Sequence, residues 1–456
     1  TPLLGGSTIV TITSAPAPSN TLAGGQTLRT SIEEHPGGKG LLSEAQPDQA
    51  DAVCCGHENT MYHVLARLPA IHTFSFLAFF LYFGHVWLLM QRPDIAVWII
   101  GSFVTYGVFR FYMMWFGAWN ALFLLRKNDV RDPEHWQKQV RPLGSMAFDS
   151  VWHAVIVPNY KEPVDKLRQT LDTIASQSIA NRIVVCMGME GRDPNAVAVA
   201  ELLQKEYAGR LGGFCYSLHP AGVDGETPGK SSNENWAARC VAQYMIEGLR
   251  IPLDCITITT CDADTFFHPN HFSYLTHQYI CDGEDRYHKF YLAVTNFLPN
   301  TGQVPAICAT RFTVLSVGRM AEMGNPLLSP FPLAIYSLSL RLAKKAAFWD
   351  PSVIPEDWHM YFRCMYADGG QVSATKLMIT VGTEAVVGRN YADTIKETYD
   401  QSVRWQWGAI DVGYLLVQTF ARWDTPLLKR LQMLYAAYDH HLLAVVICVV
   451  LVAAPF

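Results

Sequence analysis

Two aspartates, Asp262 and Asp264, stand one residue apart directly after a run of β-branched residues, Ile256 to Thr260. The alternation in that run predicts a strand, and α/β proteins bind their ligands at the carboxyl edge of such strands. Charge is costly at this position unless it serves a purpose. Two carboxylates at this edge can hold a hard cation, Mg²⁺ or Mn²⁺, whose remaining ligands are waters and substrate phosphates. The alternative is an ordinary polar turn, in which Asp is common.

Further polar side chains follow other apolar runs of the sequence. Val151 to Val157 ends at Pro158-Asn159-Tyr160-Lys161-Glu162-Pro163, and Ile183 to Met187 is followed by Glu190-Gly191-Arg192-Asp193. Lys230 stands in a Gly-Lys turn ahead of a helical stretch, where the free N–H groups of a helix N-terminus suit an anion. A solvated loop lysine is the alternative.

Two later segments combine groups that suit acid–base and sugar chemistry. Glu356 and Asp357 are adjacent carboxylates before a helical run; repulsion between them can raise one pKa and help a base, or they simply cap that helix. Gln401, Arg404 and Trp405 lie at i, i+3 and i+4, on one face of a helix. Arg offers a fork of donors to phosphate and Trp a flat platform for a sugar ring, although an interfacial amphipathic helix has the same pattern.

Alternating strand and helix patterns position these residues. Helical periodicity fills residues 166–177, 194–207 and 233–249, and short apolar runs stand at 151–157, 183–187, 214–218 and 256–260. This alternation predicts an α/β domain over residues 150–400 with a mostly parallel, Rossmann-like sheet. Residues 371–382 predict a further strand, and residues 327–340 are either core or interfacial.

The composition indicates a membrane protein in a reducing compartment. Of the 456 residues, half are hydrophobic and 16% are charged, against about 25% charged in typical soluble domains. The net charge of −5 excludes a general polyanion-binding surface, so no nucleic acid is expected as a partner. The 11 cysteines are scattered without zinc spacing, which suits a reducing compartment.

Two apolar stretches near the N-terminus predict membrane helices. Leu68 to Met90 is uncharged and long enough to span a bilayer. Ile95 to Leu125 contains Arg110, which is costly at mid-membrane, so we expect a spanning helix to about residue 109 and then an interfacial helix. Residues 64–130 thus form a transmembrane hairpin with an interfacial helix; a buried core hairpin is the alternative. Arg126, Lys127 and Arg131 place the following domain in the cytosol by the positive-inside rule.

The two ends of the chain carry their own signals. Residues 1–60 are rich in Gly, Pro, Ser and Thr, which predicts a disordered tail. Residues 401–425 predict an amphipathic interfacial helix, and residues 427–456 the start of a C-terminal membrane region. We therefore expect the sequence to be part of a longer chain.

Four motifs in this order, between membrane segments, resemble the family 2 glycosyltransferases, in particular their membrane-embedded, cellulose-synthase-like branch. They are Val157–Pro163, Asp262-Ala263-Asp264, Glu356-Asp357 and Gln401-Ser402-Val403-Arg404-Trp405. The resemblance covers residues 64–456. It implies a GT-A nucleotide-sugar-binding fold and an inverting transfer from a nucleotide-activated sugar on the cytosolic side.

The resemblance also implies roles for individual residues. Asp357 matches the base that deprotonates the acceptor hydroxyl, and Asp264 with Asp262 would hold the Mg²⁺ or Mn²⁺ that neutralises the leaving diphosphate. Lys230 stands where the family often has a lysine near the diphosphate. Glu356, Gln401, Arg404 and Trp405 belong to the acceptor and diphosphate side, and Pro158, Tyr160, Glu162, Glu190 and Asp193 to the donor side, with Tyr160 as a stacking partner of the base.

One turn departs from the family pattern. Many members have an Asp-rich turn after the second strand, whereas this chain has Met189-Glu190-Gly191-Arg192-Asp193. The nucleotide, UDP or GDP, therefore stays open, with a UDP-sugar favoured.

The resulting hypothesis is an integral membrane, metal-dependent, inverting hexosyltransferase that extends a glycan, as polysaccharide synthases do. Its partners would be a nucleotide-sugar, a glycan or lipid acceptor and the lipid bilayer. A single-addition enzyme acting on a lipid is one alternative, and a non-catalytic membrane scaffold is another, although a scaffold has no use for buried acid pairs. A transporter is disfavoured because the long stretch between hydrophobic runs has an α/β pattern rather than broken midplane helices.

Overall fold

The computed structural model describes residue 64 and residues 67–78, 89–129, 131–139, 146–207 and 209–443. The predicted tail over residues 1–60, the middle of the first predicted membrane span and the segment after residue 443 lie outside the described residues.

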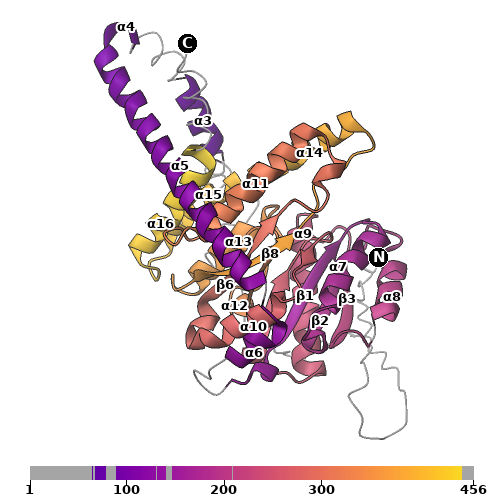
Figure 1. Cartoon of the computed structure of the whole chain (residues 1–456). Coiled ribbons are helices and arrows are strands. Elements are labelled where there is room, and N and C mark those ends of the chain that lie inside the picture. The colour runs from indigo at the N-terminus through magenta and orange to yellow at the C-terminus, as the bar shows by residue number, and fades with distance from the viewer. Residues whose placement is uncertain are drawn as a thin grey trace, which may run out of the picture.

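An eight-stranded sheet forms the centre of the protein, in the order β3-β2-β1-β4-β7-β6-β8-β5 (Figure 1). Strands β3, β2, β1 and β4 pair in parallel, as do β6 and β8, whereas β7 is antiparallel to both of its neighbours and β5 is antiparallel to β8. The predicted α/β class is therefore confirmed, but the sheet is mixed beyond β4. The strands are β1 Trp152–Asn159, β2 Ile183–Glu190, β3 Gly213–His219, β4 Ile256–Thr260, β5 Phe266–Phe267, β6 Lys289–Asn296, β7 Tyr336–Ser339 and β8 Ser373–Gly382.

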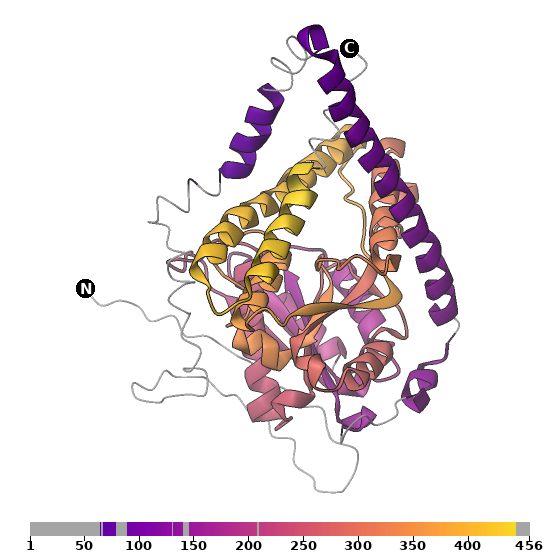
Figure 2. The same ribbon diagram turned by 90° about the vertical axis from the view of Figure 1, so that its left-hand side faces the viewer.

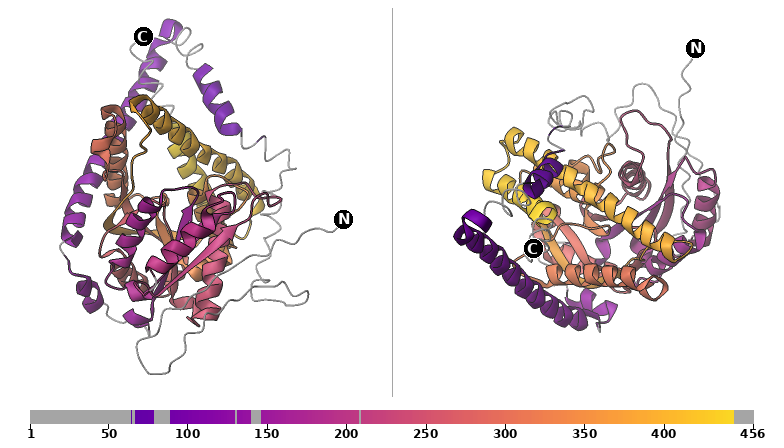
Figure 3. Two further views of the ribbon diagram at one scale, coloured as in Figure 1. Left: turned by 90° about the vertical axis from the view of Figure 1, so that its right-hand side faces the viewer. Right: turned by 90° about the horizontal axis from the view of Figure 1, so that it is seen from above.

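Helices cover both faces of this sheet (Figures 1 and 3). Alternate residues of β1 belong to two separate cores, with Ala154 and Ile156 in one and Val155 and Val157 in the other. Both faces are buried, which is why the parallel strands are continuous apolar runs in the sequence. The core that contains Val155 and Val157 includes α7 Val164–Ala175, α8 Ala196–Tyr207 and α10 His271–Cys281. The core that contains Ala154 and Ile156 includes α9 Lys230–Gln243, α12 Leu340–Lys345 and α13 Glu356–Ala367.

The predicted helices and strands of the first half correspond to α7, α8, α9, β1, β2, β3 and β4 within a few residues. The predicted strand at residues 371–382 is β8. Residues 336–339 of the segment left open between core and interface form β7, which is buried throughout. Short turns complete the chain; they are the 3₁₀ segments Phe148–Ser150, Ala180–Arg182, Leu253–Cys255, Gly283–His288, Thr301–Gln303 and Trp407–Ala409 and the π segments Tyr244–Gly248 and Asp439–Leu443.

The helix α5, Pro93–Asp129, extends well beyond the sheet domain (Figures 1 and 2). We predicted a change to a separate interfacial helix near Arg110, but α5 runs through this residue without a break. The guanidinium of Arg110 pairs with Asp439 at 2.9 Å and hydrogen-bonds to the Tyr106 hydroxyl at 3.2 Å, so a partner offsets its charge. Among the described residues, one helical stretch, Val104–Asp129, is long and apolar enough to cross a membrane.

Among the described residues, α11 Ala306–Gly324 packs on α5, where the Asn120 amide donates to the Gly324 carbonyl at 2.7 Å. The helix α15 Ile410–Ala421 packs on α16 Leu427–Tyr438 and contacts α3 Leu68–Ala78, while α4 Leu89–Gln91 precedes α5 and α6 Pro133–Gln139 follows it. The predicted helix over residues 401–425 is not one element. Gln401 to Gln406 form the end of α14, Tyr391–Gln406, and a 3₁₀ turn at Trp407–Ala409 separates this helix from α15.

Candidate active site

The aspartate pair lies just past the carboxyl end of β4. All five residues of β4 are buried, and the strand pairs in parallel with β1. The N–H of Cys261 donates to the Ile156 carbonyl at 3.2 Å, and the Thr265 hydroxyl donates to the Asp262 carbonyl at 2.8 Å. These bonds fix the turn, from which the two carboxylates reach different lysines.

Asp262 belongs to a group of carboxylates around Lys230. The Lys230 ammonium lies 2.8 Å from Oδ1 of Asp262, 2.9 Å from Oε1 of Glu356 and 3.7 Å from Oε1 of Glu234. Glu234 is fully buried and accepts a hydrogen bond from the Thr260 hydroxyl. We call Lys230, Glu234, Asp262, Glu356 and Asp357 the acid cluster.

Electrostatics keep Lys230 charged. Burial lowers the pKa of Lys230, but the carboxylates, led by Asp262 and Glu356, outweigh burial and hold that pKa well above its ordinary value. Burial also raises the pKa of Glu234 well above its usual range. One ammonium therefore faces several carboxylates, an arrangement that favours additional positive charge nearby.

Asp357, the predicted base, lies in this cluster in the first turn of α13. Its Oδ2 accepts a hydrogen bond from the Ala334 N–H at 2.7 Å, and its buried Oδ1 has no hydrogen-bond partner among the described residues. Burial, opposed by Lys230 and reinforced by Glu356, raises the pKa of Asp357 to about 7. Ala334 has φ of 48°, a left-handed conformation that is strained for alanine and that tends to occur at functional sites.

Asp264 lies in a second group, around Lys166 of α7. The Lys166 ammonium is 3.9 Å from Asp264, 3.5 Å from Glu162 and 3.5 Å from Glu384, which follows β8. The Thr383 hydroxyl donates to Asp264 at 3.0 Å. Glu162, which the sequence assigns to the donor side, thus shares the Lys166 ammonium with Asp264.

The carboxylate oxygens of Asp262 and Asp264 fit a hard divalent cation. Both groups offer carboxylate oxygens, the ligand type that Mg²⁺ and Mn²⁺ prefer. Their side chains keep access to solvent, at 36% for Asp262 and 19% for Asp264. Burial and the charge of Asp262 raise the pKa of Asp264 to about 6, against the influence of Lys166. Two carboxylates that repel each other in this way gain from a shared cation.

The ends of β1 and β2 form the region predicted for the donor. The Tyr160 ring is 45% exposed, and the guanidinium carbon of Arg192 lies 4.7 Å from its centre. Arg192 also pairs with Glu190 at 2.9 Å. Asp193 instead accepts a hydrogen bond from the Asn195 N–H at 3.0 Å, in the turn ahead of α8, and Pro158 lies within β1 opposite Gly188.

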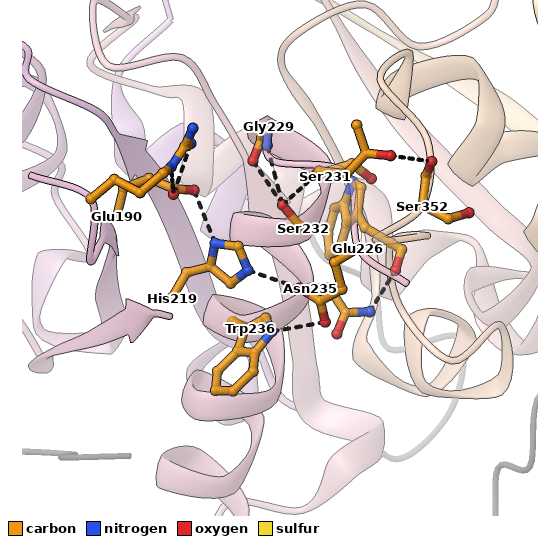
Figure 4. Close-up of polar contacts among 12 residues, drawn as sticks. Glu190, His219, Glu226, Gly229, Ser231, Ser232, Asn235, Trp236 and Ser352 are labelled. Carbon is orange, nitrogen blue, oxygen red and sulfur yellow. Dashed lines mark hydrogen bonds and ion pairs between the residues drawn. The ribbon is translucent and has the colours of Figure 1, made fainter. Parts of the chain in front are cut away.

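A buried chain of hydrogen bonds continues from Glu190 (Figure 4). Nδ1 of His219 lies 3.1 Å from Glu190, and Nε2 of His219 lies 2.8 Å from Glu226, which accepts a hydrogen bond from the Trp236 indole at 3.2 Å. Burial lowers the pKa of His219, but hydrogen bonds to both carboxylates outweigh it and raise that pKa. His219 therefore joins the ends of β2 and β3 to the loop before α9.

The loop before α9 is also tied to the segment that precedes α13. The Thr227 hydroxyl donates to the Ser352 carbonyl at 2.7 Å, and the Ser231 hydroxyl donates to the Asp350 carbonyl at 2.5 Å. The side chain of Asp350 lies 3.4 Å from the ring of His359 in α13. These contacts hold Lys230 and the Glu356-Asp357 pair in fixed relation.

Gln401, Arg404 and Trp405 lie apart from the acid cluster, in the last turns of α14. The Trp405 ring is 5.8 Å from the Phe297 ring and 5.3 Å from the Arg311 guanidinium carbon, so it packs beside β6 and α11. Within the described part of the chain, no hydrogen bond or ion pair joins the three residues to Asp262, Asp264 or Asp357. The three residues thus make no direct contact with these acids, and their assignment to the acceptor and diphosphate side stays a prediction.

Five charged residues of the site were not predicted from the sequence. Lys166 and Glu234 stand four residues after Glu162 and Lys230, a helical spacing that could have revealed them. Glu384, His219 and Glu226 have no local signal, because only the tertiary fold brings them to the strand ends. Their partners are the residues that the motifs did identify.

The family model described as Glycosyl transferase family group 2 matches residues 257–456. No curated protein sequence matches the chain. Solved structures with low similarity include a mannosyltransferase, PcManGT, from Pyrobaculum calidifontis in complex with GDP-Man and Mn²⁺, at 14% identity and a TM-score of 0.38, covering 78% of this chain and 91% of that one. They also include S. aureus TarS, at 11% identity and a TM-score of 0.38, covering 64% and 43% of the two chains, and GalNAc-T7 with UDP, GalNAc and Mn²⁺, at 9% identity and a TM-score of 0.34, covering 64% and 55%. Similarity at this level assigns neither donor nor acceptor.

The matched residues begin in β4 and include both aspartates of the pair, the Glu356-Asp357 pair and the end of α14. Residues 257–456 are therefore similar to the glycosyl transferase family group 2, over somewhat less than half of the chain.

Proposed function

We propose that this protein is a membrane-bound, inverting, metal-dependent glycosyltransferase of the cellulose-synthase-like branch, which adds sugars from a nucleotide-sugar donor to a growing glycan. The observation that carries the proposal is the state of Asp357. This carboxyl group is buried, has a pKa raised to about 7 and keeps one oxygen without a hydrogen-bond partner among the described residues. A general base that works near neutral pH needs these properties.

Asp357 acts on the acceptor. Its Oδ1 accepts the proton of the acceptor hydroxyl as that oxygen attacks the anomeric carbon of the donor sugar, and the nucleoside diphosphate leaves from the opposite face. The hydrogen bond from Ala334 to Oδ2 holds the carboxyl group in position during the transfer. Inversion at the anomeric carbon follows because the base and the leaving group lie on opposite faces of the sugar.

The leaving group acquires negative charge, and Lys230 supplies positive charge where α9 begins. Free N–H groups at this helix N-terminus add to the same field. Asp262 and Asp264 would hold the Mg²⁺ or Mn²⁺ ion, which supplies Lewis-acid neutralisation of the diphosphate. Burial and the charge of Asp262 raise the pKa of Asp264, so added positive charge here would favour its ionised form.

The ends of β1 and β2 form the nucleotide side. Tyr160 offers an exposed ring for stacking on the base, and the Arg192 guanidinium also lies against this ring. Glu190 is fixed by Arg192 and His219, so it can accept hydrogen bonds from the base without reorganising. A UDP-sugar is the favoured donor, and the complexes of PcManGT with GDP-Man and of GalNAc-T7 with UDP make both nucleotides worth testing.

Membrane attachment is supported by the exposed apolar surface of α5. Phe111, Trp115, Trp119 and Phe123 are all more than half exposed. The helix α16 also exposes large apolar side chains, namely Leu427, Leu428 and Tyr435. Lys127 and Arg126 end α5 on the side of the sheet domain, which supports a cytosolic catalytic site.

A donor screen tests the function. UDP-glucose, UDP-N-acetylglucosamine, UDP-glucuronate and GDP-mannose are offered to the detergent-solubilised chain with Mn²⁺ or Mg²⁺, and release of nucleoside diphosphate is followed. We expect turnover with one donor, lost on chelation of the metal and in Asp357→Asn, but kept in the control Asp285→Asn at an exposed position. Product length separates a growing glycan from a single addition to a lipid. Absence of both turnover and binding for every donor would favour the scaffold alternative.

A further inference from the structure

Three cysteine side chains meet on the α9 side of the sheet, away from the acid cluster. Cys186 lies in β2, Cys215 is its register partner in β3, and Cys240 lies on α9 above them. Their sulfur atoms all lie within 4.8 Å of one another. Cys186 and Cys215 are fully buried, and all three cysteines are free thiols. We call these residues the thiol cluster.

The spacing of the thiol cluster suits a single ion. Three sulfur atoms bound to one Zn²⁺ ion at about 2.3 Å lie about 4 Å apart. The observed limit of 4.8 Å therefore requires only small side-chain adjustments. The three ligands come from two paired strands and a helix packed on them, so the backbone already holds them together before an ion arrives.

Besides the three sulfur atoms, the hydroxyl oxygen of Tyr244 lies close to the thiol cluster. Tyr244 stands one helical turn after Cys240, and its ring lies over Gly213, whose added Cβ would come within 3.1 Å of the Tyr244 hydroxyl. Gly213 is two residues before Cys215, on the same face of β3. Tyr244 is 3% exposed, and its hydroxyl has no hydrogen-bond partner among the described residues. A buried polar group of this kind indicates that the site accommodates something further.

Charge decides which class of ion fits. Three thiolates around a monovalent ion leave a net charge of −2 in a buried site, whereas a divalent ion leaves −1, which costs less to bury. Thiolates favour soft and borderline cations over Mg²⁺ or Mn²⁺.

We propose that Cys186, Cys215 and Cys240 form a site for one thiophilic divalent cation of the Zn²⁺ class, with the Tyr244 hydroxyl beside it. The site is separate from Asp262 and Asp264, and the proposal does not depend on the glycosyltransferase assignment. Cys240 stands ten residues after Lys230, about 15 Å along α9. An ion here joins β2, β3 and α9, the three elements whose other ends carry Glu190, His219 and Lys230.

The test uses Cd²⁺ as a spectroscopic probe. The purified full chain, reduced and free of metal, is titrated with Cd²⁺ under anaerobic conditions, and the sulfur-to-cadmium charge-transfer band in the ultraviolet is recorded. A band that saturates at one ion per chain is expected. The variants Cys186→Ala and Cys240→Ala should bind Cd²⁺ at least about tenfold more weakly, while Cys364→Ala, at a buried cysteine elsewhere in the core, should keep the band.

Two further readouts keep the test decisive if a variant folds poorly. In the native chain, Zn²⁺ should protect Cys240 from alkylation, detected by mass spectrometry, and at a hundred times its dissociation constant it should raise the folded-to-unfolded ratio about 100-fold. Absence of a charge-transfer band in the native chain overturns the proposal. So does a band that persists unchanged in the Cys186→Ala/Cys240→Ala double variant, or Cys240 alkylation that Zn²⁺ does not slow.

Discussion

Replacing Lys230 with methionine tests the electrostatic account of the site most directly. Methionine keeps much of the length of the side chain and removes the ammonium that lies 2.8 Å from Asp262 and 2.9 Å from Glu356. The carboxylates left behind include Glu234, whose Oε2 is buried without a hydrogen-bond partner among the described residues. Removing one partner from a buried ion pair typically costs about 3–5 kcal/mol. The side chains of Lys230 and Asp262 are 23% and 36% exposed, so the lower value, about 3 kcal/mol, applies here.

The expected loss can be measured by thermal unfolding in detergent. For a domain of this size, 1 kcal/mol corresponds to a shift of about 2 °C in the melting temperature, so Lys230→Met should melt about 6 °C below the native chain at neutral pH. The matched control is Lys138→Met, because Lys138 pairs with Glu134 at 2.7 Å and the two side chains are 75% and 73% exposed. An exposed pair contributes little to stability, so this control should melt within about 2 °C of the native chain.

The pH dependence of Lys230→Met adds a second check. Without the ammonium, the carboxylates of the acid cluster gain protons more readily in the folded state than in the unfolded state. The variant should therefore recover stability as pH falls from about 8 to about 5, relative to the native chain. Adding Glu356→Gln, which removes the carboxylate 2.9 Å from the position of the Lys230 ammonium, should restore part of the lost melting temperature. If Lys230→Met melts like the Lys138→Met control at neutral pH, the carboxylates are not ionised around the Lys230 ammonium and the electrostatic account of the site is wrong.

Three further predictions rest on single contacts. Burial raises the pKa of Asp357 to about 7, so kcat/KM should rise with pH around 7 as this carboxyl group ionises. For the same reason the free energy of unfolding should fall as pH rises between about 4 and 7. A flat stability profile, or one that is unchanged in Asp357→Asn, would contradict this. Burial lowers the pKa of His359, but Asp411 at 2.7 Å and a second carboxylate outweigh burial and raise that pKa to about 9. Protonated His359 therefore stabilises the fold fully below about pH 6.5, and this contribution is lost as pH rises through 9. The melting temperatures of His359→Gln and the native chain should therefore differ least at high pH. A Cβ at Gly324 would meet the Gly117 carbonyl oxygen and lie 2.7 Å from Cβ of Ala121, so Gly324→Ala should give little folded protein by gel filtration, whereas Gly318→Ala on the same helix, whose nearest atom would be 3.9 Å away, should fold normally.

The sequence predicted the parallel half of the sheet because each of its strands is buried on both faces and is followed by a helix of clear periodicity. The strands β6 and β7 were not predicted, since short apolar runs have no period that separates strand from helix. Gln401, Arg404 and Trp405 share a helix face as predicted, but their distance from Asp357 depends on how α14 packs on α11, which no local pattern encodes. Arg110 misled the prediction of a helix end because its partner, Asp439, is more than 300 residues away.

The precision of the site depends on how closely α9 approaches the sheet. Gly188 in β2 has no side chain, and a Cβ there would lie 2.6 Å from Oδ1 of Asn233, whose amide donates to the Gly188 carbonyl at 2.9 Å. Ala237, one turn further along α9, is fully buried beside the same strand. Small residues at these contacts let the first turn of α9 lie directly on the carboxyl ends of the strands. Lys230 is therefore held against Asp262 by backbone packing rather than by its own flexible side chain, and the positive charge is in position before a substrate arrives, as electrostatic catalysis requires.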